Sequence, residues 1–296
     1  MYTILLLTDF SAASRHAIAY TQALFGDTAV DFCLLHVCPL EPEMEFAGAT
    51  LLAERWQTAE ASLNHLQQEL AQAPEPIYHT YRTLLRMGEP TGVVNQLLAK
   101  ETTKFDLVVL GATGSGWSEL LGSVATEMVR EAKTNVLVVP DDAPIRPVDR
   151  LVLATDYRSI VDVQSLRLLS ELANRKAAWL TLLTIENPLG TKAPASELSR
   201  QYVLRALESV LTDTYTIHDD NVLHGIDAYV KTHTVDLLVM LPHHKSFFDV
   251  LLHKSVSRSV AFHPSVPLLS LYDINHQSIS LNESSALDKI PFATFL

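Results

Sequence analysis

The sequence predicts an α/β fold with two tandem domains, each built on an open, five-stranded parallel sheet with helices on both faces. Three observations lead to this prediction. Short apolar runs of strand length alternate with longer amphipathic segments, which is typical of parallel sheets covered by helices. The alternation starts twice, on either side of a polar, proline-containing stretch at residues 141–147. The length of 296 residues also suits about two domains.

We therefore expect a first domain, a linker, a second domain and a tail, at residues 1–141, 142–148, 149–274 and 275–296. Hydrophobic residues make up 48% of the chain and charged residues 19%, which is enough for a core in each domain. The tail shows no periodicity from which a helix or strand can be predicted.

In the first domain, apolar runs predict five strands, at residues 3–8, 31–38, 77–86, 106–110 and 135–139. Between them, apolar residues at helical spacing predict four helices. These helices cover residues 13–24, 50–73, 93–98 and 124–133. Ser11 would cap the first helix and Gly26 would end it.

In the second domain, the same reading predicts five strands, at residues 150–155, 178–186, 215–217, 236–240 and 266–271. The helices cover residues 166–172, 195–210 and 222–232, with a loop and a further helix before the last strand. The order of elements therefore matches that of the first domain.

Two short motifs indicate that this order is an internal repeat. Leu-Leu-Thr-Asp at 6–9 corresponds to Leu-Ala-Thr-Asp at 153–156, and Asp-Leu-Val-Val-Leu at 106–110 corresponds to Asp-Leu-Leu-Val-Met at 236–240. The offset falls from 147 residues at the first pair to 130 at the second, so the second copy has lost 17 residues between its first and fourth strands. A tandem duplication explains both the length and the repeated order.

The most informative stretch is the glycine-rich segment 111–123, which lies between a predicted strand and a predicted helix. Four of the ten glycines of the chain fall within residues 111–122. A strand, a glycine-rich loop and a helix form a typical phosphate site, because glycines let the backbone approach and free N–H groups face the negative charge. The segment has neither the Walker A pattern nor G-x-G-x-x-G spacing. A surface loop with turn glycines is the alternative interpretation.

Composition argues against two classes of partner. The formal net charge is −12, and no run of Lys or Arg provides the basic face that nucleic-acid binding requires. No signal peptide is visible, and no apolar run has the ~20 residues that cross a bilayer. We therefore expect a cytoplasmic protein that binds neither nucleic acid nor membrane. Cys33 and Cys38 lie five residues apart on one predicted strand, so they should point to opposite faces and remain reduced.

Several motifs together give the chain a family resemblance. Thr8-Asp9-Phe10-Ser11, Leu34-Leu35-His36-Val37, Met87-Gly88-Glu89-Pro90 and the segment 111–139 resemble a universal stress protein. The two copies resemble a tandem member of that family. The resemblance implies Rossmann-like domains, a regulatory role in the stress response and binding of ATP, with Mg²⁺ accompanying it. The chain departs from the family in two places: Leu7 replaces a proline, and seven residues rather than nine separate Gly114 from Gly122.

The resemblance also implies a set of binding residues. Asp9, in the turn with Thr8, would lie at the adenine or ribose, and Val37 would bind the adenine edge through its backbone. Gly111 and Gly114 begin the conserved loop pattern. The phosphates would be held by Gly114, Gly122, Ser123 and Val124. The aspartate, the valine and the loop all follow carboxyl ends of strands, where open α/β sheets bind ligands.

The corresponding loop of the second copy, residues 241–248, contains no glycine, so we do not expect it to bind ATP in the same way. The resemblance implies that the two domains pair through their last strands. The sequence leaves open whether two chains form a homodimer and which protein partner is bound. The alternative function is a nucleotide-free interaction scaffold of the same fold.

An enzyme is the third hypothesis, and the sequence gives it little support. We identify no catalytic residues, since the loop has no general base or metal-binding carboxylate cluster and no G-x-S-x-G elbow. Any ATPase activity should therefore be weak. His243, His244, His253 and His263 suggest a metal site, but their spacing matches no standard one. Surface or capping histidines are the simpler interpretation.

Overall fold

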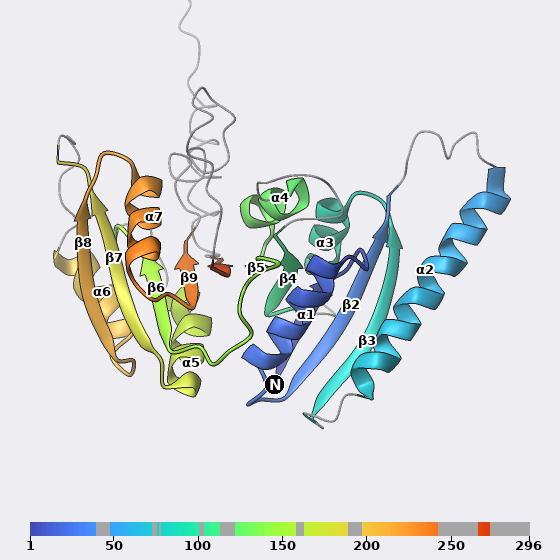
Figure 1. Cartoon of the computed structure of the whole chain (residues 1–296), viewed down its shortest axis with the longest axis horizontal. Coiled ribbons are helices and arrows are strands. Elements are labelled where there is room, and N and C mark those ends of the chain that lie inside the picture. Colours follow the sequence, from blue (N-terminus) through green and yellow to red (C-terminus); the bar gives the residue numbers. More distant parts are fainter. Residues whose placement is uncertain are drawn as a thin grey trace, which may run out of the picture.

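The computed structural model describes residues 1–39, 48–72, 76, 78–100, 104–112, 122–157, 163–188, 197–241 and 266–272. Within these residues the chain forms a single ten-stranded sheet in the order β3-β2-β1-β4-β5-β10-β9-β6-β7-β8. Each half of the chain supplies five neighbouring strands (Figure 1). The predicted α/β class is confirmed, although the strands form one continuous sheet rather than two separate ones.

The N-terminal half follows the predicted order of strands and helices. Its strands are β1 (Tyr2–Leu7), β2 (Val30–Cys38), β3 (His79–Met87), β4 (Leu107–Gly111) and β5 (Asn135–Val139). Its helices are α1 (Ala12–Leu24), α2 (Gly48–Ala71), α3 (Pro90–Leu98) and α4 (Ser123–Glu131). All neighbouring strands of this half are parallel. Ser11 caps α1, as its sequence predicts.

The C-terminal half has the same arrangement of strands, but its strands follow one another across the sheet in the opposite direction. Its strands are β6 (Arg150–Ala154), β7 (Trp179–Glu186), β8 (Thr212–His218), β9 (Leu237–Met240) and β10 (Leu268–Ser270). Its helical segments are η2 (Val163–Leu166), α5 (Arg167–Lys176), α6 (Glu197–Ala206) and α7 (Val222–Thr232). The helix predicted between the last two strands lies outside the described residues, as does the predicted tail, residues 275–296.

The two halves join through one antiparallel strand pair. Leu268 lies opposite Val138 and Ser270 opposite Val136, so β10 extends the sheet beyond β5. All other described strand pairs are parallel. A pairing of last strands is what the repeat architecture implies, and here it occurs within one chain.

Side chains add a second connection between the halves. Arg175 on α5 forms an ion pair with Asp27 at 2.8 Å, and its guanidinium lies over the ring of Tyr2 at 5.3 Å. The Tyr2 hydroxyl donates a hydrogen bond to Glu171, also on α5. These contacts place the start of β1 and the end of α1 against the C-terminal half.

The core has two layers because the strands are buried on both faces. Ile4 and Leu6 pack on the side that also contains residues of α1, α2, α5 and α6, whereas Leu5 packs with α3, α4 and α7. Cys33 belongs to the second layer and Cys38 contacts the first, which confirms their predicted opposite faces. Both cysteines are free thiols. Among the described residues, no helix is long and apolar enough to span a bilayer.

Candidate functional site

The predicted site residues lie where three neighbouring strands end. Strand β1 lies between β2 and β4, with Leu7 opposite Leu35 and Leu6 opposite Val109. Because all three strands are parallel, their carboxyl ends meet at one edge of the sheet, which is where open α/β sheets bind ligands. Thr8 follows β1 and Gly111 ends β4, so the register brings both to this edge.

The turn after β1 has a fixed backbone. Phe10 has φ of 64°, in the left-handed region that a bulky residue rarely adopts. The buried Thr8 hydroxyl accepts a hydrogen bond from the Phe10 N–H at 3.0 Å and lies 3.1 Å from the Ser14 hydroxyl. These bonds hold the turn in its unusual conformation, and Asp9 is left exposed at its tip.

The Asp9 carboxylate is held in position by its neighbour Ser11. Its Oδ1 atom accepts hydrogen bonds from the Ser11 N–H at 3.0 Å and from the Ser11 hydroxyl at 2.5 Å. Partial burial alone would raise the pKa of Asp9, but the hydrogen bonds from Ser11 outweigh it and lower this pKa below the ordinary value. The group is therefore an ionised acceptor at neutral pH, a state suited to binding the hydroxyls of a sugar.

Val37 presents its backbone to the same edge. Leu35 accepts a hydrogen bond from Thr8 on the β1 side of the strand, and Cys38 accepts one from Gly88 on the β3 side. Backbone groups alternate in direction along a parallel strand. The N–H and C=O of Val37 therefore point to the β1 side, beyond the residue where β1 ends.

Gly111 is required for packing as well as for its place in the loop pattern. A Cβ atom added to Gly111 would lie 3.0 Å from the carbonyl carbon of Ala13, 3.1 Å from its oxygen and 3.2 Å from its Cβ. The end of β4 and the first turn of α1 thus approach each other as closely as a glycine allows. This contact places the end of β4 beside the turn that carries Asp9.

The loop after β4 is closed by a hydrogen bond between its two ends. The N–H of Gly122 donates to the carbonyl of Ala112 at 2.7 Å. Residues 113–121, which include Gly114, lie outside the described residues. Gly122 is the N-cap of α4, and Ser123 and Val124 are its first two residues. Within the described residues, no side chain caps this end.

Helix α4 differs in this respect from three other helices. Side chains of Ser11, Glu89 and Asn221 accept hydrogen bonds from the first N–H groups of α1, α3 and α7. In α4 the first bond within the helix runs from Thr126 to Gly122, so the N–H groups of Ser123 and Val124 come before any intrahelical bond. Free N–H groups and the helix dipole together favour an anion at such an end.

One supporting residue was missed by the sequence-based selection. Nδ1 of His36 lies 2.7 Å from the carbonyl oxygen of Thr8, and its ring packs on Phe10 with the centroids 4.6 Å apart. His36 thus fixes the turn that carries Asp9. The sequence contains one signal that could have identified His36: it is a polar residue within an apolar strand, directly before Val37.

The metal hypothesis rests on histidines that the structure does not describe. Within the described part of the chain, no group of three or more His, Cys, Asp or Glu side chains could hold a metal ion. His243, His244, His253 and His263 lie outside that part.

Comparison with known proteins bears on the family and the fold. Residues 1–140 match the sequence model of the Universal stress protein family. A search of curated proteins finds no match. The fold resembles a universal stress protein from Archaeoglobus fulgidus DSM 4304, with a TM-score of 0.68, 16% identity and coverage of 91% of this chain and 96% of that chain.

Two further structures extend the comparison. A putative universal stress protein from Pseudomonas aeruginosa UCBPP-PA14 has a TM-score of 0.53 and 14% identity, covering 96% of this chain and 98% of that chain. A universal stress protein crystallised in complex with cAMP covers 48% of this chain and 98% of its own, with a TM-score of 0.35 and 22% identity. The structures from Archaeoglobus fulgidus and Pseudomonas aeruginosa have TM-scores above 0.5 and cover nearly the whole chain. Because their identities are low, they establish the fold alone.

Proposed function

Because the N-terminal half of the chain, residues 1–140, belongs to the universal stress protein family, we propose that the protein is a stress-response regulator that binds ATP or a related nucleotide in this half. The observation that carries the proposal is the start of α4 at Gly122, which follows the loop from β4 and which no side chain of the described residues caps. This end supplies free N–H groups at the edge where β1, β2 and β4 terminate.

Each described residue has a role suited to one part of a nucleotide. The backbone N–H and C=O of Val37 match the donor and acceptor pattern of an adenine edge. The ionised Asp9 carboxylate accepts hydrogen bonds from ribose hydroxyls. The N–H groups of Ser123 and Val124 face the phosphates, and Gly122 lets these phosphates approach the backbone. Gly114 would complete the phosphate contacts, and Mg²⁺ would enter with the nucleotide, held mainly by phosphate oxygens and water.

The C-terminal half has a different role in this proposal. Its segment 241–248 contains no glycine, so it lacks the backbone cradle that phosphates require. Its strand β10 instead pairs with β5 and completes the sheet. We propose that this half is a built-in partner of the nucleotide-binding half.

The alternative function is a scaffold of the same fold that binds a protein partner and no nucleotide. The observation that favours it is the loop length, because only seven residues separate Gly114 from Gly122. The backbone of a shorter loop can surround less of a triphosphate. Direct measurement of nucleotide binding separates the two proposals.

The test is calorimetric titration of the full chain with Mg-ATP, after denaturing extraction has shown that no nucleotide copurifies. In Gly122→Asp, a carboxylate would stand where the phosphates bind, and we expect at least about a 100-fold loss of affinity from like-charge repulsion. The matched control is Gly26→Asp. It adds the same side chain after the C-terminal end of α1, whereas the proposed site lies at the N-terminal end of that helix. This control should bind as the parent does.

Two results would overturn the proposal. One is a parent chain that binds neither ATP, ADP, AMP nor cAMP once it is free of nucleotide, which would favour the scaffold. The other is a Gly122→Asp variant that retains the parent melting temperature and affinity. Thermal unfolding of both variants shows whether a loss of binding reflects the site or the fold.

A further inference from the structure

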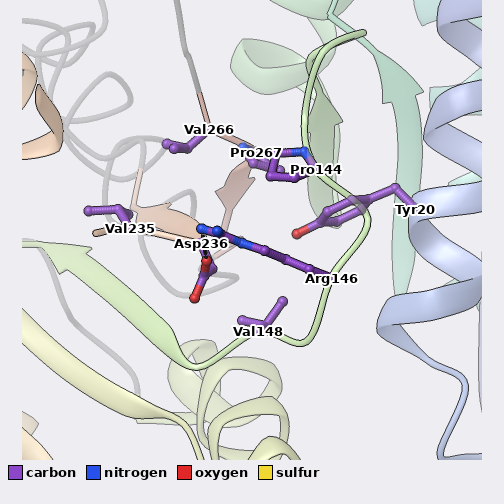
Figure 2. A pocket seen from close by; sticks show the side chains of 8 residues that line it. All are labelled: Tyr20, Pro144, Arg146, Val148, Val235, Asp236, Val266 and Pro267. Carbon is purple, nitrogen blue, oxygen red and sulfur yellow. Dashed lines mark hydrogen bonds and ion pairs between the residues drawn. The ribbon is translucent and has the colours of Figure 1, made fainter. Parts of the chain in front are cut away.

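The sheet ends in two outer edges, β3 and β8, because the last strands of the two halves are already paired (Figure 1). At the junction, β10 pairs with β5. Near the start of β10, Nη2 of Arg146 in the linker donates to Oδ1 of Asp236 at 2.6 Å, and Figure 2 shows these two side chains meeting. A further strand would therefore have to add to one of the two outer edges.

The β3 edge is covered by its own half, since α2 lies along this strand (Figure 1). The N–H of Gly88 donates toward β2, so by alternation the carbonyl of Tyr81 points away from β2. Nε2 of Gln67 on α2 donates to this carbonyl at 2.7 Å. The outward N–H of His79 donates to Pro76 at 3.1 Å. Outward backbone groups of β3 thus have partners within the chain.

The β8 edge has no such partners. Leu211 accepts a hydrogen bond from Leu180 at 2.9 Å, and Asp219 donates one to Glu186 at 3.0 Å, so the backbone groups at both ends of β8 point to β7. Because these groups alternate along a strand, the even-numbered residues of β8 point outward. No hydrogen bond joins their N–H or C=O groups to another described residue. The open positions are Thr212, Thr214, Thr216 and His218.

The centre of β8 is also exposed on both faces of the sheet. Thr214 and Thr216 are exposed on the face of α6. Tyr215 is 42% exposed on the face of α7, where its ring lies 5.0 Å from that of Tyr229. Edges that stay single are usually protected by Lys, Pro, a bulge or a covering segment. Residues 212–218 contain neither Lys nor Pro, and they pair with β7 without a bulge.

The sequence of β8 suits pairing with a second copy of itself. A two-fold axis beside Tyr215, perpendicular to the sheet, places two β8 strands antiparallel. Thr214 then lies opposite Thr216 of the second copy, and Thr212 lies opposite His218. These are the open positions, so each pair can exchange two backbone hydrogen bonds. Tyr215 lies opposite its own copy, and both aromatic pairs and Thr–Thr pairs favour strand pairing.

The carboxylate of the strand is compatible with this register. Asp213 lies opposite Ile217 of the second copy, so the two Asp213 residues are four positions apart along the strand, or about 13 Å. This distance exceeds the screening length of about 8 Å at physiological ionic strength. The open backbone groups, the side-chain pairs and the charges therefore all suit a second copy of this chain.

We propose that two copies of the chain form a homodimer by antiparallel pairing of their β8 strands, centred on Tyr215, which joins two ten-stranded sheets into one. The proposed nucleotide site lies in the other half of each chain, at the ends of β1, β2 and β4, so the dimer leaves it free. Two seven-residue strands form an interface below the roughly 1,200 Å² of a stable complex, so we expect a reversible dimer with a Kd of about 10–100 µM.

The first test is sedimentation velocity of the full chain between about 1 and 300 µM. We expect the average mass to rise from that of one chain, 32.8 kDa, toward twice this value. Tyr215→Lys places two positive charges directly opposite each other and should weaken the dimer at least about tenfold. The matched control is Tyr78→Lys, because Tyr78 is 45% exposed and directly precedes the other edge strand. This control should dimerise as the parent does.

Two further measurements identify the strand that pairs. Amide hydrogen exchange in residues 212–218 should slow as the concentration rises and the dimer forms. Tyr215→Cys should give a disulfide-linked dimer under mild oxidation, because opposed residues at this kind of position have Cα atoms about 4.5 Å apart, which suits a disulfide. Tyr78→Cys is the control and should give no more linked dimer than the parent.

Three results would overturn the proposal. One is a parent chain that remains monomeric up to about 300 µM. Another is a dimer that Tyr215→Lys and Tyr78→Lys weaken equally, with both variants shown to be folded by thermal unfolding. The third is protection of residues 212–218 that is the same at low and high concentration, because another segment of the same chain would then occupy this edge. If Tyr215→Lys fails to fold, the cross-link at Tyr215→Cys decides, and its absence counts against the dimer.

Discussion

The two halves of the molecule build the same turn after their first strand. Phe10 and Tyr157 have φ values of 64° and 59°, and their N–H groups donate to the hydroxyls of Thr8 and Thr155 at 3.0 and 2.9 Å. The N–H groups of the two threonines donate in turn to β2 and β7, each at 2.9 Å. The repeat seen in the sequence is therefore a repeat of backbone geometry.

The halves differ at the next strand end. In the N-terminal half, Gly111 allows the first turn of α1 to lie directly against the end of β4. Its counterpart by the repeat is Leu241, which is buried and belongs to the core on the side of α5 and α6. The same position thus serves close approach of the backbone in one half and core packing in the other.

A second difference concerns the counterpart of Val37. This position is Ile185 in the C-terminal half, and a Cβ added to Gly225 of α7 would lie 2.8 Å from its Cδ1 atom. In α3, the residue that follows the cap by four positions is Val93, whereas in α7 it is Gly225. Glycine lets α7 approach Ile185 closely. At this end of the C-terminal sheet, Ile185 and α7 are therefore packed closely together.

The largest expected effect tests the close approach at Gly111. Gly111→Leu places the residue type of position 241 against the backbone of Ala13, and overpacking there should lower the free energy of unfolding by about 3 kcal/mol. Gly111→Ala adds only the Cβ atom and should cost less. Urea denaturation of both variants measures the difference. A Gly111→Leu variant as stable as the parent would contradict the close packing of β4 against α1.

The next effect compares two aspartates that precede equivalent strands. Asp236 accepts from Arg146, Asp149 and Arg150, whereas Asp106 accepts from the Thr3 N–H at 2.8 Å. Asp236→Ala should cost about 2 kcal/mol, because it leaves two N–H groups without their acceptor and removes an ion pair with the half-exposed Arg146. Asp106→Ala should cost about 1 kcal/mol. Equal losses in denaturant unfolding would show that Arg146 adds nothing to the junction.

Local patterns in the sequence were sufficient to predict the class of fold and the order of elements. Strands buried on both faces appear as continuous apolar runs, which is why β1, β4 and β9 were located within one or two residues. Most of the 17 missing residues of the second copy are missing from one helix. Helix α2 has 24 residues and its counterpart α6 has 10, a difference of 14.

Contacts between distant segments could not be predicted in this way. The edge strand β8 covers Thr212–His218, but only residues 215–217 were predicted because its exposed residues do not form an apolar run. The ion pair between Asp27 and Arg175 joins residues 148 positions apart. The role of Gly111 against Ala13 also depends on tertiary packing. The candidate site was therefore predicted as a set of residues, and its supporting contacts required the structure.

A smaller effect tests whether only one half binds nucleotide. Asp9→Asn removes the charge that we assign to the ribose, and the affinity for Mg-ATP should fall about tenfold. Asp156→Asn is the matched change in the repeated turn and should leave the affinity unchanged. Calorimetric titration of both variants measures this contrast. An equal loss in both would indicate that the second half also takes part in binding.

The smallest effect concerns how each half lowers the pKa of an aspartate. For Asp9, burial opposes the lowering and the Ser11 hydroxyl is the largest favourable cause, whereas for Asp219 the backbone N–H of Asn221 contributes most and His224 less. Ser11→Ala should therefore raise the pKa of Asp9 toward its ordinary value of 3.8, while His224→Ala should leave that of Asp219 lowered. Carbon-13 NMR titration of the carboxyl groups measures both.

The sign of the effect on stability follows from the direction of these shifts. A carboxyl whose folded pKa is depressed stabilises the fold above its unfolded pKa, and this contribution is lost as the pH falls through the folded pKa. With the hydroxyl of Ser11 removed, the folded pKa of Asp9 lies closer to the unfolded one, so the loss of stability that involves Asp9 in acid should be smaller than in the parent and complete at a higher pH. An unchanged Asp9 titration in Ser11→Ala would show that the backbone N–H of Ser11 is sufficient. The turn of the N-terminal half would then hold its carboxylate as Asp219 is held, mainly by the backbone.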